Sequence, residues 1–123
     1  MKHIISFLAL FIGFSTYGQI KEKTYVKIEP KVIEWRHDIH QYPELSNREF
    51  RTAEKVAKHL KSLGMEVKTG VAHTGVVGLL RGKRPGKVVA LRADMDALPV
   101  KERNNLPYRS KEIGEFMGNK VPI

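Results

Sequence analysis

The chain has no cysteine among its 123 residues, which excludes a disulfide framework, a thiolate nucleophile and a thiolate metal ligand. Stability must therefore come from a packed core. No apolar run reaches the roughly 20 residues that a membrane-spanning helix needs. Aromatic residues make up only 8% of the chain and are not interleaved with a run of basic residues. The sequence therefore does not indicate a nucleic-acid site that stacks bases on aromatic rings.

Basic residues outnumber acidic ones, 22 against 13, which gives a formal net charge of +9. If Lys2 is removed with the N-terminal leader that the next paragraph predicts, the net charge becomes +8. Such a balance permits binding to anionic surfaces. Because the lysines and arginines are scattered, we interpret them as parts of solvated faces and loops, and we expect no nucleic-acid partner.

The first 18 residues have the order of a secretory signal. Lys2 is followed by an apolar stretch, Ile4 to Phe14, and then by small, turn-prone residues. We therefore expect residues 1–18 to be a cleaved signal peptide, with cleavage near Gly18–Gln19. The mature chain would be secreted or periplasmic, with no stable membrane anchor. A buried N-terminal helix is the alternative.

Two helices are predicted next. Residues 19–29 are polar and are expected to form an extended lead-in. Pro30 suits the first turn of a helix, and apolar residues then recur at helical spacing until Tyr42–Pro43 forbids continuation. Ser46 stands three residues before Glu49, which is the spacing of a capping box at the start of a second helix.

The second helix has the most regular pattern in the chain, and Gly64 is expected to end it. Lysines lie mostly off its apolar face. That face consists of Phe50, Ala53, Val56, Ala57, Leu60 and Leu63.

Three apolar segments follow. Residues 65, 67 and 69 alternate with polar residues, as in a strand with one solvent-exposed face. Residues 76–80 and 88–91 are apolar runs separated by the turn signal Pro85–Gly86, which predicts an antiparallel hairpin packed on the second helix. The predicted fold class is α/β, with two N-terminal helices packed on a partial mixed sheet.

Residues 101–123 are rich in polar residues, glycine and proline and show no convincing periodicity. Long structureless segments are uncommon in compact domains. We therefore expect the domain to be incomplete in this chain.

Two carboxylates, Asp94 and Asp96, lie in the stretch LRADMDALPV at the end of the expected last strand. In an extended conformation both side chains point to the same face. There they could repel one another, share a proton, or hold a cation or a metal-bound histidine. The alternative is a turn in which aspartate caps free backbone amides. Arg92 could form an ion pair with either carboxylate.

Three segments together resemble a known family. They are RHDIHQYPELSNREFRTAEKVAKHLKSLGMEV (36–67), HTGVVGLLRGKRPGKVVALRADMDALPVKE (73–102) and LPYRSKEIGEFMG (106–118). In order and spacing they resemble the N-terminal part of the dinuclear-metal amidohydrolases related to aminoacylase, hippurate hydrolase, indole-acetyl-amino-acid hydrolases and zinc carboxypeptidases. The resemblance covers the chain from about Ile33, and HxxPELS, TGVV and RADMDALP are its specific motifs.

This resemblance implies hydrolysis of the amide bond in N-acyl amino acids or small peptides. The family uses two divalent metal ions, zinc or manganese, with a bridging water and a glutamate base. Asp96 matches the family aspartate that follows this strand and would orient a metal-ligating imidazole from outside the coordination sphere. Asp94 stands where the carboxypeptidase-like branch has a histidine ligand. An aspartate there favours N-acyl amino acids over peptides as substrates.

The family's metal ligands, as the resemblance implies them, are a cysteine and a histidine soon after the segment in which this chain ends, then a glutamate and two further histidines. None of them has a counterpart here, so no metal ligand is expected in this chain. Residues 30–123 would be the truncated N-terminal part of a catalytic domain with a zinc-peptidase-like fold, inactive by itself. A homodimer would require a further domain.

The histidines have structural interpretations. His37 and His40 are three residues apart on a helix, which is a metal-compatible spacing. We instead expect His40, at the end of the helix, to form a hydrogen bond with the backbone. His59 is expected to face solvent. His73 precedes a tight turn in which Gly75 is the structural residue.

A different class of function is also compatible with the sequence. The chain would then be a small secreted basic binding module that keeps the scaffold without catalysis. If the domain is instead incomplete, apolar edges such as Val88 to Leu91 would stay open to pairing, and we expect the isolated chain to be poorly soluble.

Overall fold

A computed structural model describes residues 22–123, so the predicted signal peptide, residues 1–18, lies outside the described residues. The chain divides into two units, Met1–Val32 and Ile33–Ile123. In the described part of the first unit the side chains from Lys23 to Val32 are exposed. The second unit contains the features on which the functional argument depends.

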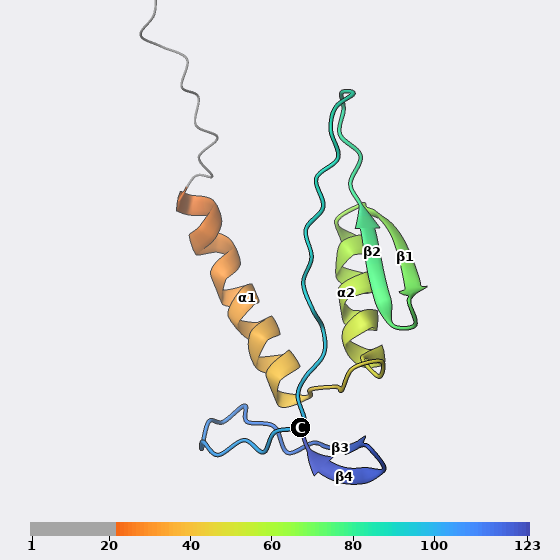
Figure 1. Cartoon of the computed structure of the whole chain (residues 1–123). Coiled ribbons are helices and arrows are strands. Elements are labelled where there is room, and N and C mark those ends of the chain that lie inside the picture. Colours follow the sequence, from red (N-terminus) through yellow and green to blue (C-terminus); the bar gives the residue numbers. More distant parts are fainter. Residues whose placement is uncertain (1–21) are drawn as a thin grey trace, which may run out of the picture. The chain divides into compact units, whose positions relative to one another are not determined.

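Helix α1 covers Glu22–Gln41 and has Pro30 in its interior (Figure 1). The extended lead-in predicted for residues 19–29 is therefore wrong from Glu22 onward, as is a helix start at Pro30. Glutamate and lysine in this segment are good helix formers, and the helix continues through Pro30 although an interior proline removes a hydrogen-bond donor and crowds the carbonyl four residues earlier. The helix ends before Pro43, as predicted.

Helix α2 covers Phe50–Ser62, as the apolar stripe predicted. Its N-cap is Glu49, whose side chain makes no capping bond, so the capping box predicted from Ser46 is wrong. Glu44 takes that role from outside the helix. Its Oε1 accepts from the backbone N–H of Arg51 at 3.0 Å, and its Oε2 accepts from the N–H of Thr52 at 2.8 Å. One carboxylate thus satisfies two of the free amides at the helix N-terminus.

Gly64 ends α2 as predicted. Its N–H donates to the carbonyl of Lys61 at 2.9 Å, and the N–H of Met65 donates to the carbonyl of Leu60 at 3.3 Å. This pair of bonds is the Schellman arrangement, in which the residue after the C-cap adopts a left-handed conformation. Gly64 has φ +76, which glycine adopts without a Cβ clash.

An ion-pair cluster joins the second half of α1 to α2. The carboxylate of Asp38 accepts hydrogen bonds from Lys55 and, at 2.7 Å, from Nη2 of Arg51. These bonds, first from Lys55 and then from Arg51, hold the pKa of Asp38 below its ordinary value although burial opposes the shift. The Arg51 guanidinium also lies 4.8 Å from the ring centroid of Tyr42. The cluster therefore depends on the ionised form of Asp38.

Within residues 22–123 the β structure consists of two separate antiparallel sheets. Strand β1 (Glu66–Val71) pairs with β2 (Gly75–Leu79), and β3 (Ile113–Phe116) pairs with β4 (Asn119–Pro122). Helix α2 packs on β1 and β2 (Figure 1). The α/β class is confirmed, whereas the predicted mixed sheet is wrong.

The predicted hairpin of residues 76–80 with 88–91 is also wrong, because β2 pairs with β1 instead. A turn of three residues, 72–74, joins β1 to β2, and so short a loop is cheaper to close than the longer connection to residue 88. Residues 80–96 form no strand. Val88 and Leu91, expected in a buried strand, are 86% and 96% exposed.

The β3–β4 hairpin lies in a segment for which no regular element was predicted. Its register pairs Phe116 with Asn119, so Met117 and Gly118 form a two-residue turn, with φ values of +51 and +75. Positive φ at both turn positions is typical of a type I′ hairpin. Methionine is unusual in such a position, which is why the turn was missed.

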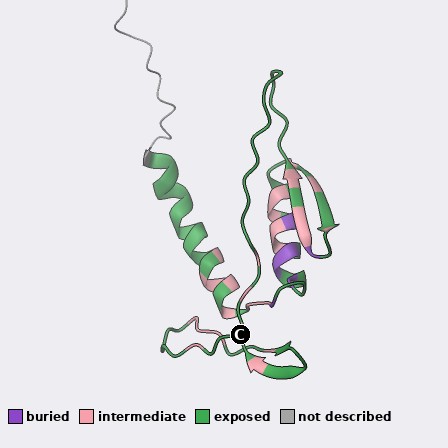
Figure 2. Cartoon of the chain, viewed as in Figure 1, coloured by how far each residue is buried: buried purple, intermediate pink, exposed green. Residues whose placement is uncertain are grey.

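The core is small (Figure 2). Among the described residues the buried apolar ones are Leu45, Ala53 and Ala57, and Leu45 lies close to Gly114 and Ile123. Leu45 also forms an isolated parallel bridge with Ala97. The Pro-Glu-Leu segment therefore connects α2, through Glu44, to both the β3–β4 hairpin and the segment that contains Asp96. No helix in residues 22–123 is long and apolar enough to cross a membrane.

Candidate functional site

A cavity of about 590 Å³ lies beside Asp96, between the last turns of α1, residues 95–102 and the chain end at Ile123. Its apolar walls come from Ile39, Pro43, Met95, Ala97, Leu98, Val100 and Ile123. Its polar lining consists of Arg36, His40, Asp96, Glu102 and Ser110. Apolar walls with a few polar groups are typical of small-molecule sites.

The backbone next to Asp96 is held in place. The N–H of Ala97 donates to the carbonyl of Glu44 at 2.8 Å, beside the bridge to Leu45. The Asp96 side chain is exposed on the cavity and, among the described residues, makes no hydrogen bond or ion pair. Its carboxylate is therefore available to accept a hydrogen bond from a donor brought into the cavity.

Asp94 has a different environment. Its Oδ1 accepts from Nε of Arg92 at 3.1 Å and lies 3.0 Å from Nη2 of the same residue. The predicted ion pair is therefore present, but on an exposed segment, with 89% of the Arg92 side chain and 69% of the Asp94 side chain accessible. No strand forms there, and of the two aspartates only Asp96 lines the cavity.

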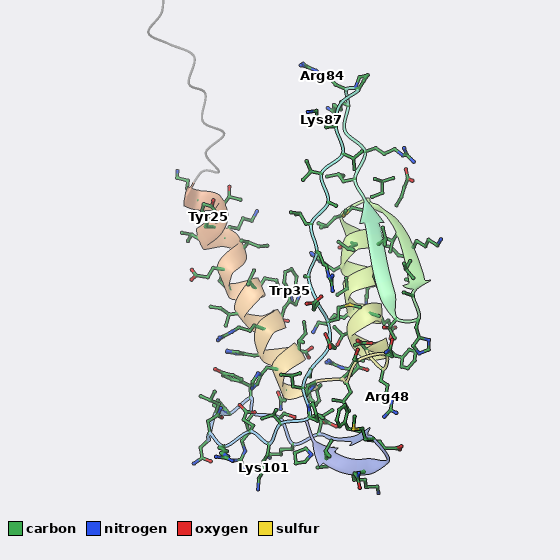
Figure 3. All side chains as sticks on the ribbon, in the orientation of Figure 1. Tyr25, Trp35, Arg48, Arg84, Lys87 and Lys101 are labelled. Carbon is green, nitrogen blue, oxygen red and sulfur yellow. The ribbon has the colours of Figure 1, made fainter. Side chains whose placement is uncertain are left out.

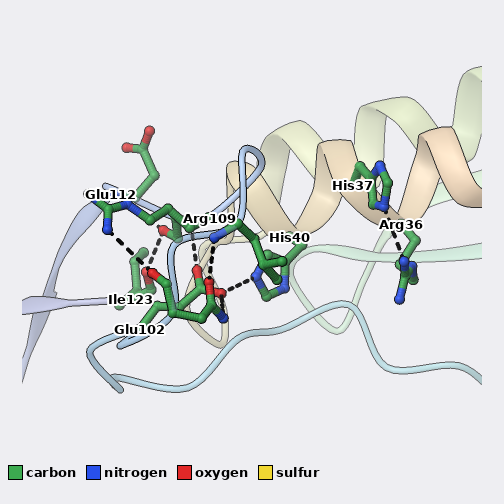
Figure 4. A network of polar contacts seen from close by, with 10 residues as sticks. Arg36, His37, His40, Glu102, Arg109, Glu112 and Ile123 are labelled. Atoms are coloured by element: carbon green, nitrogen blue, oxygen red, sulfur yellow. Dashed lines mark hydrogen bonds and ion pairs between the residues drawn. The ribbon is translucent and has the colours of Figure 1, made fainter.

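Glu102 organises the loop on the other side of the cavity (Figure 4). Its Oε1 lies 2.8 Å from Nε2 of His40 and 2.6 Å from Nδ2 of Asn104, and its Oε2 accepts from the N–H of Ser110 at 2.7 Å. The hydrogen bond from His40, followed by those from Ser110 and Asn104, holds the pKa of Glu102 below its ordinary value, against the opposing effect of burial. This network joins the end of α1 to the 102–110 loop.

The predicted environments of the histidines need correction. His40 bonds to the Glu102 carboxylate rather than to the backbone. His37 stacks on Tyr108, with ring centroids 3.7 Å apart, and does not join His40 in a ligand pair. His59 is half-buried rather than solvent-facing, because the half-buried ring of Trp35 on α1 lies edge-on to it, with ring centroids 4.5 Å apart.

The turn prediction at His73 is confirmed, since Gly75 is the structural residue. A Cβ added to Gly75 would lie 2.4 Å from the carbonyl oxygen of Val71, so no other residue fits without a backbone shift. His73 itself has φ +90 and contacts the ring of Phe50 edge-on.

The described residues do not fit a two-metal centre. No three histidine, aspartate or glutamate side chains within residues 22–123 come together as metal ligands would. Asp94 and Glu102 are committed to Arg92 and to the His40 network, which leaves the Asp96 carboxylate alone. A catalytic zinc takes about three protein ligands. No catalytic step through a metal can therefore be built from these side chains.

Two functional contacts were missed from the sequence, and both lie in the quoted motifs. Glu44 of the Pro-Glu-Leu-Ser segment caps α2. The Thr74 hydroxyl donates to Oε2 of Glu49 at 2.6 Å, and both residues are buried. Burial alone raises the pKa of Glu49, but the hydrogen bond from Thr74 and those from backbone amides outweigh it, so the pKa lies below its ordinary value. Both carboxylates, Glu44 and Glu49, lie within the six residues before α2, and this position was the available signal.

Comparisons with curated proteins give matches at high identity. Thermostable carboxypeptidase 1 of Saccharolobus solfataricus is 54% identical over 89 residues, which are 72% of this chain and 23% of that protein. Hippurate hydrolase of Campylobacter jejuni is 52% identical over 77 residues, 63% of this chain and 20% of that protein. N-acyl-L-amino acid amidohydrolase of Geobacillus stearothermophilus is 43% identical over 88 residues, 72% and 24% respectively.

These matches confirm the resemblance that the motifs indicated. The chain belongs to the family of amidohydrolases and carboxypeptidases, a family whose named members here are hydrolases. It spans about a quarter of the length of the curated relatives it matches. No family model matches the chain. No solved structure matches it either.

Proposed function

We propose that this chain is part of a metal-dependent hydrolase that cleaves the amide bond of N-acyl amino acids or small peptides. The observation that carries the proposal is the identity of 43–54% over 88 or 89 residues with proteins named as an amidohydrolase and a carboxypeptidase. The names of the relatives include both substrate classes. The aspartate at position 94 is the reason to favour N-acyl amino acids.

In this proposal the described residues build a scaffold, and the metal ligands come from elsewhere in the functional protein. Bound metal would lower the pKa of a water molecule and polarise the amide carbonyl. The contribution of this chain is Asp96, a positioning residue that accepts a hydrogen bond from a metal-ligating imidazole. Its free carboxylate on the cavity and the anchored backbone at Ala97 support that role. The chain alone would then be inactive.

Export and assembly are part of the same proposal. Residues 1–18 would direct secretion and be removed near Gly18–Gln19. The test is the N-terminal residue of protein recovered from outside the cytoplasm, which should be Gln19 or an immediate neighbour. An intact Met1 on exported protein would contradict this. Any homodimer would form through a further domain, so this chain alone is expected to form no dimer.

A chimera tests the activity. The 89 matched residues of thermostable carboxypeptidase 1 are replaced by those of this chain, and the product is assayed with N-benzoylglycine, N-acetyl amino acids and short peptides. We expect hydrolysis of at least one substrate class, abolished by a chelator and restored by zinc or manganese. A chimera that folds and binds metal but hydrolyses none of these substrates would contradict the proposal.

Two matched variants of the chimera test the role of Asp96. Asp96→Asn should lower metal affinity or kcat by about 10- to 100-fold, the usual effect of losing a partner of a metal ligand. Its melting temperature should not change, because Asp96 makes no bond within residues 22–123. Asp94→Asn removes the same charge two residues away and should leave metal affinity and kcat nearly unchanged. Equal effects of both variants would rule out a specific positioning role for Asp96.

A further inference from the structure

A charged arm extends from the end of β2. It consists of residues 80–94, and every one of these residues is exposed (Figure 2). Its tip, the basic tip, is Arg81–Lys87, where the sequence RGKRPGK places four cations and no acid within seven residues. The Pro85–Gly86 turn lies within the tip. Figure 3 shows Arg84 and Lys87 at the far end of the arm. Four of the 22 basic residues of the chain therefore lie together at this tip.

Most of this charge is not neutralised. Arg81 is paired with Glu66, with Nε to Oε1 at 2.5 Å and Nη2 to Oε2 at 3.1 Å. The other three cations, Lys83, Arg84 and Lys87, make no hydrogen bond or ion pair with any residue from 22 to 123. A surface cluster of three unpaired cations attracts polyanions at low ionic strength.

Apolar side chains flank the basic tip on both sides. Leu80 is 71% exposed, Val88 86% and Val89 83%. Exposed apolar residues that border a cluster of cations are the composition of segments that bind the interface of a membrane, where the cations meet lipid headgroups and the apolar side chains enter the acyl boundary.

We propose that the basic tip and its apolar flanks, residues 80–89, form a reversible docking surface for anionic lipid bilayers. Charge complementarity carries the proposal, because clusters of lysine and arginine are attracted to the negative surface of an anionic membrane. Nucleic acid fits this surface less well. The arm has no aromatic side chain on which a base could stack, and it presents no helix or strand to a groove. None of residues 80–89 lines the cavity, and the surface does not depend on the proposed hydrolysis.

Vesicle binding by the full chain tests the proposal. The probes are large vesicles of phosphatidylcholine alone and of phosphatidylcholine mixed with phosphatidylglycerol, and bound protein is measured by flotation with the vesicles, which leaves aggregated protein behind. We expect binding to the mixed vesicles only, and its loss at an ionic strength of about 1 M, where the screening length falls to about 3 Å. Absence of binding to the anionic vesicles at low salt would overturn the proposal.

The variant Lys83→Gln/Arg84→Gln/Lys87→Gln should weaken binding to the anionic vesicles about 100-fold, since three surface cations are removed. All three side chains are exposed and unpaired, so folding should not change, and far-ultraviolet circular dichroism would verify this. A second variant, Val88→Ser/Val89→Ser, keeps every charge and should weaken binding severalfold.

The matched control is Lys58→Gln/Lys61→Gln/Lys68→Gln, which removes the same net charge from exposed positions on α2 and β1. It should bind the anionic vesicles within about twofold of the unchanged chain if the tip is the specific contact. An equal loss in both triple variants would show that net charge alone drives binding and would refute a dedicated surface. Tighter binding to duplex DNA than to the vesicles, with the same dependence on the tip, would show that the partner is nucleic acid and would refute the lipid proposal.

Discussion

The carboxylate of Glu44 should be the main stabilising contact at the start of α2, and replacing it with alanine tests this. The two bonds to the backbone amides of Arg51 and Thr52 involve an ionised acceptor and are stronger than neutral ones. A helix N-cap contributes about 0.5–2 kcal/mol, and a negative charge at a helix N-terminus adds about 0.3–1 kcal/mol. Because Glu44 is only half-buried, we expect Glu44→Ala to destabilise α2 by about 2 kcal/mol and Glu44→Gln by about 1 kcal/mol.

Amide hydrogen exchange followed by NMR is the suitable assay, because it reports on α2 by itself. The reporter is the buried Ala57, whose amide lies within the helix and away from the mutated contact. A loss of about 2 kcal/mol should accelerate its exchange about 30-fold. Glu54→Ala is the matched control, since it removes the same charge from an exposed position on α2 and should change exchange little. Equal acceleration by Glu44→Ala and Glu54→Ala would refute the capping argument.

Three further predictions concern the packing of the same unit. Thr52→Val should be neutral or stabilise by about 1 kcal/mol in urea unfolding, because the Thr52 hydroxyl is buried and has no hydrogen-bond partner among residues 22–123. A clear loss of stability would contradict this. Gly75→Ala should destabilise by about 1–3 kcal/mol, because its Cβ would clash with a backbone oxygen, whereas Gly86→Ala, with open space around it, should have little effect; equal thermal shifts in the two variants would contradict this. The hydrogen bonds from Lys55 and Arg51 lower the pKa of Asp38 in the folded protein. Asp38 therefore stabilises the fold fully above its unfolded-state pKa of about 3.9, and this stabilisation is lost as the pH falls through the lower folded-state pKa. Asp38→Asn should flatten the pH dependence of stability in that acidic range, and an unchanged slope would show that the ion pairs contribute nothing.

Local patterns in the sequence were sufficient for the elements that depend on near neighbours. The apolar stripe of α2 and its glycine stop follow from residues three and four apart, which share a helix face whatever the rest of the chain does. The pairing of Arg92 with Asp94 is similarly local. The family was recognisable because motifs such as LRADMDALPV combine many specific residues in order, and the curated relatives confirm it.

The contacts between distant segments followed from the tertiary structure alone. Glu44 rather than Ser46 caps α2, because the loop before the helix folds back so that a carboxylate reaches two amides. Methionine in the β3–β4 turn has positive φ because the pairing of the two strands over-determines the backbone there.

Strand partners and the environment of the aspartates were decided in the same way. A strand pattern states which face is apolar but not which neighbour completes the hydrogen bonds, so β2 could pair equally well, on sequence grounds, with residues before or after it. Closure of the short turn to β1 decided that choice, and it left residues 80–94 exposed. Asp94 then stayed on the exposed arm while the bridge between Leu45 and Ala97 brought Asp96 to the cavity. The sequence by itself thus determined helix α2, the family and the identity of the candidate carboxylates. Only long-range pairing decided which of these carboxylates lines the cavity, because side-chain direction depends on backbone contacts that no local pattern encodes.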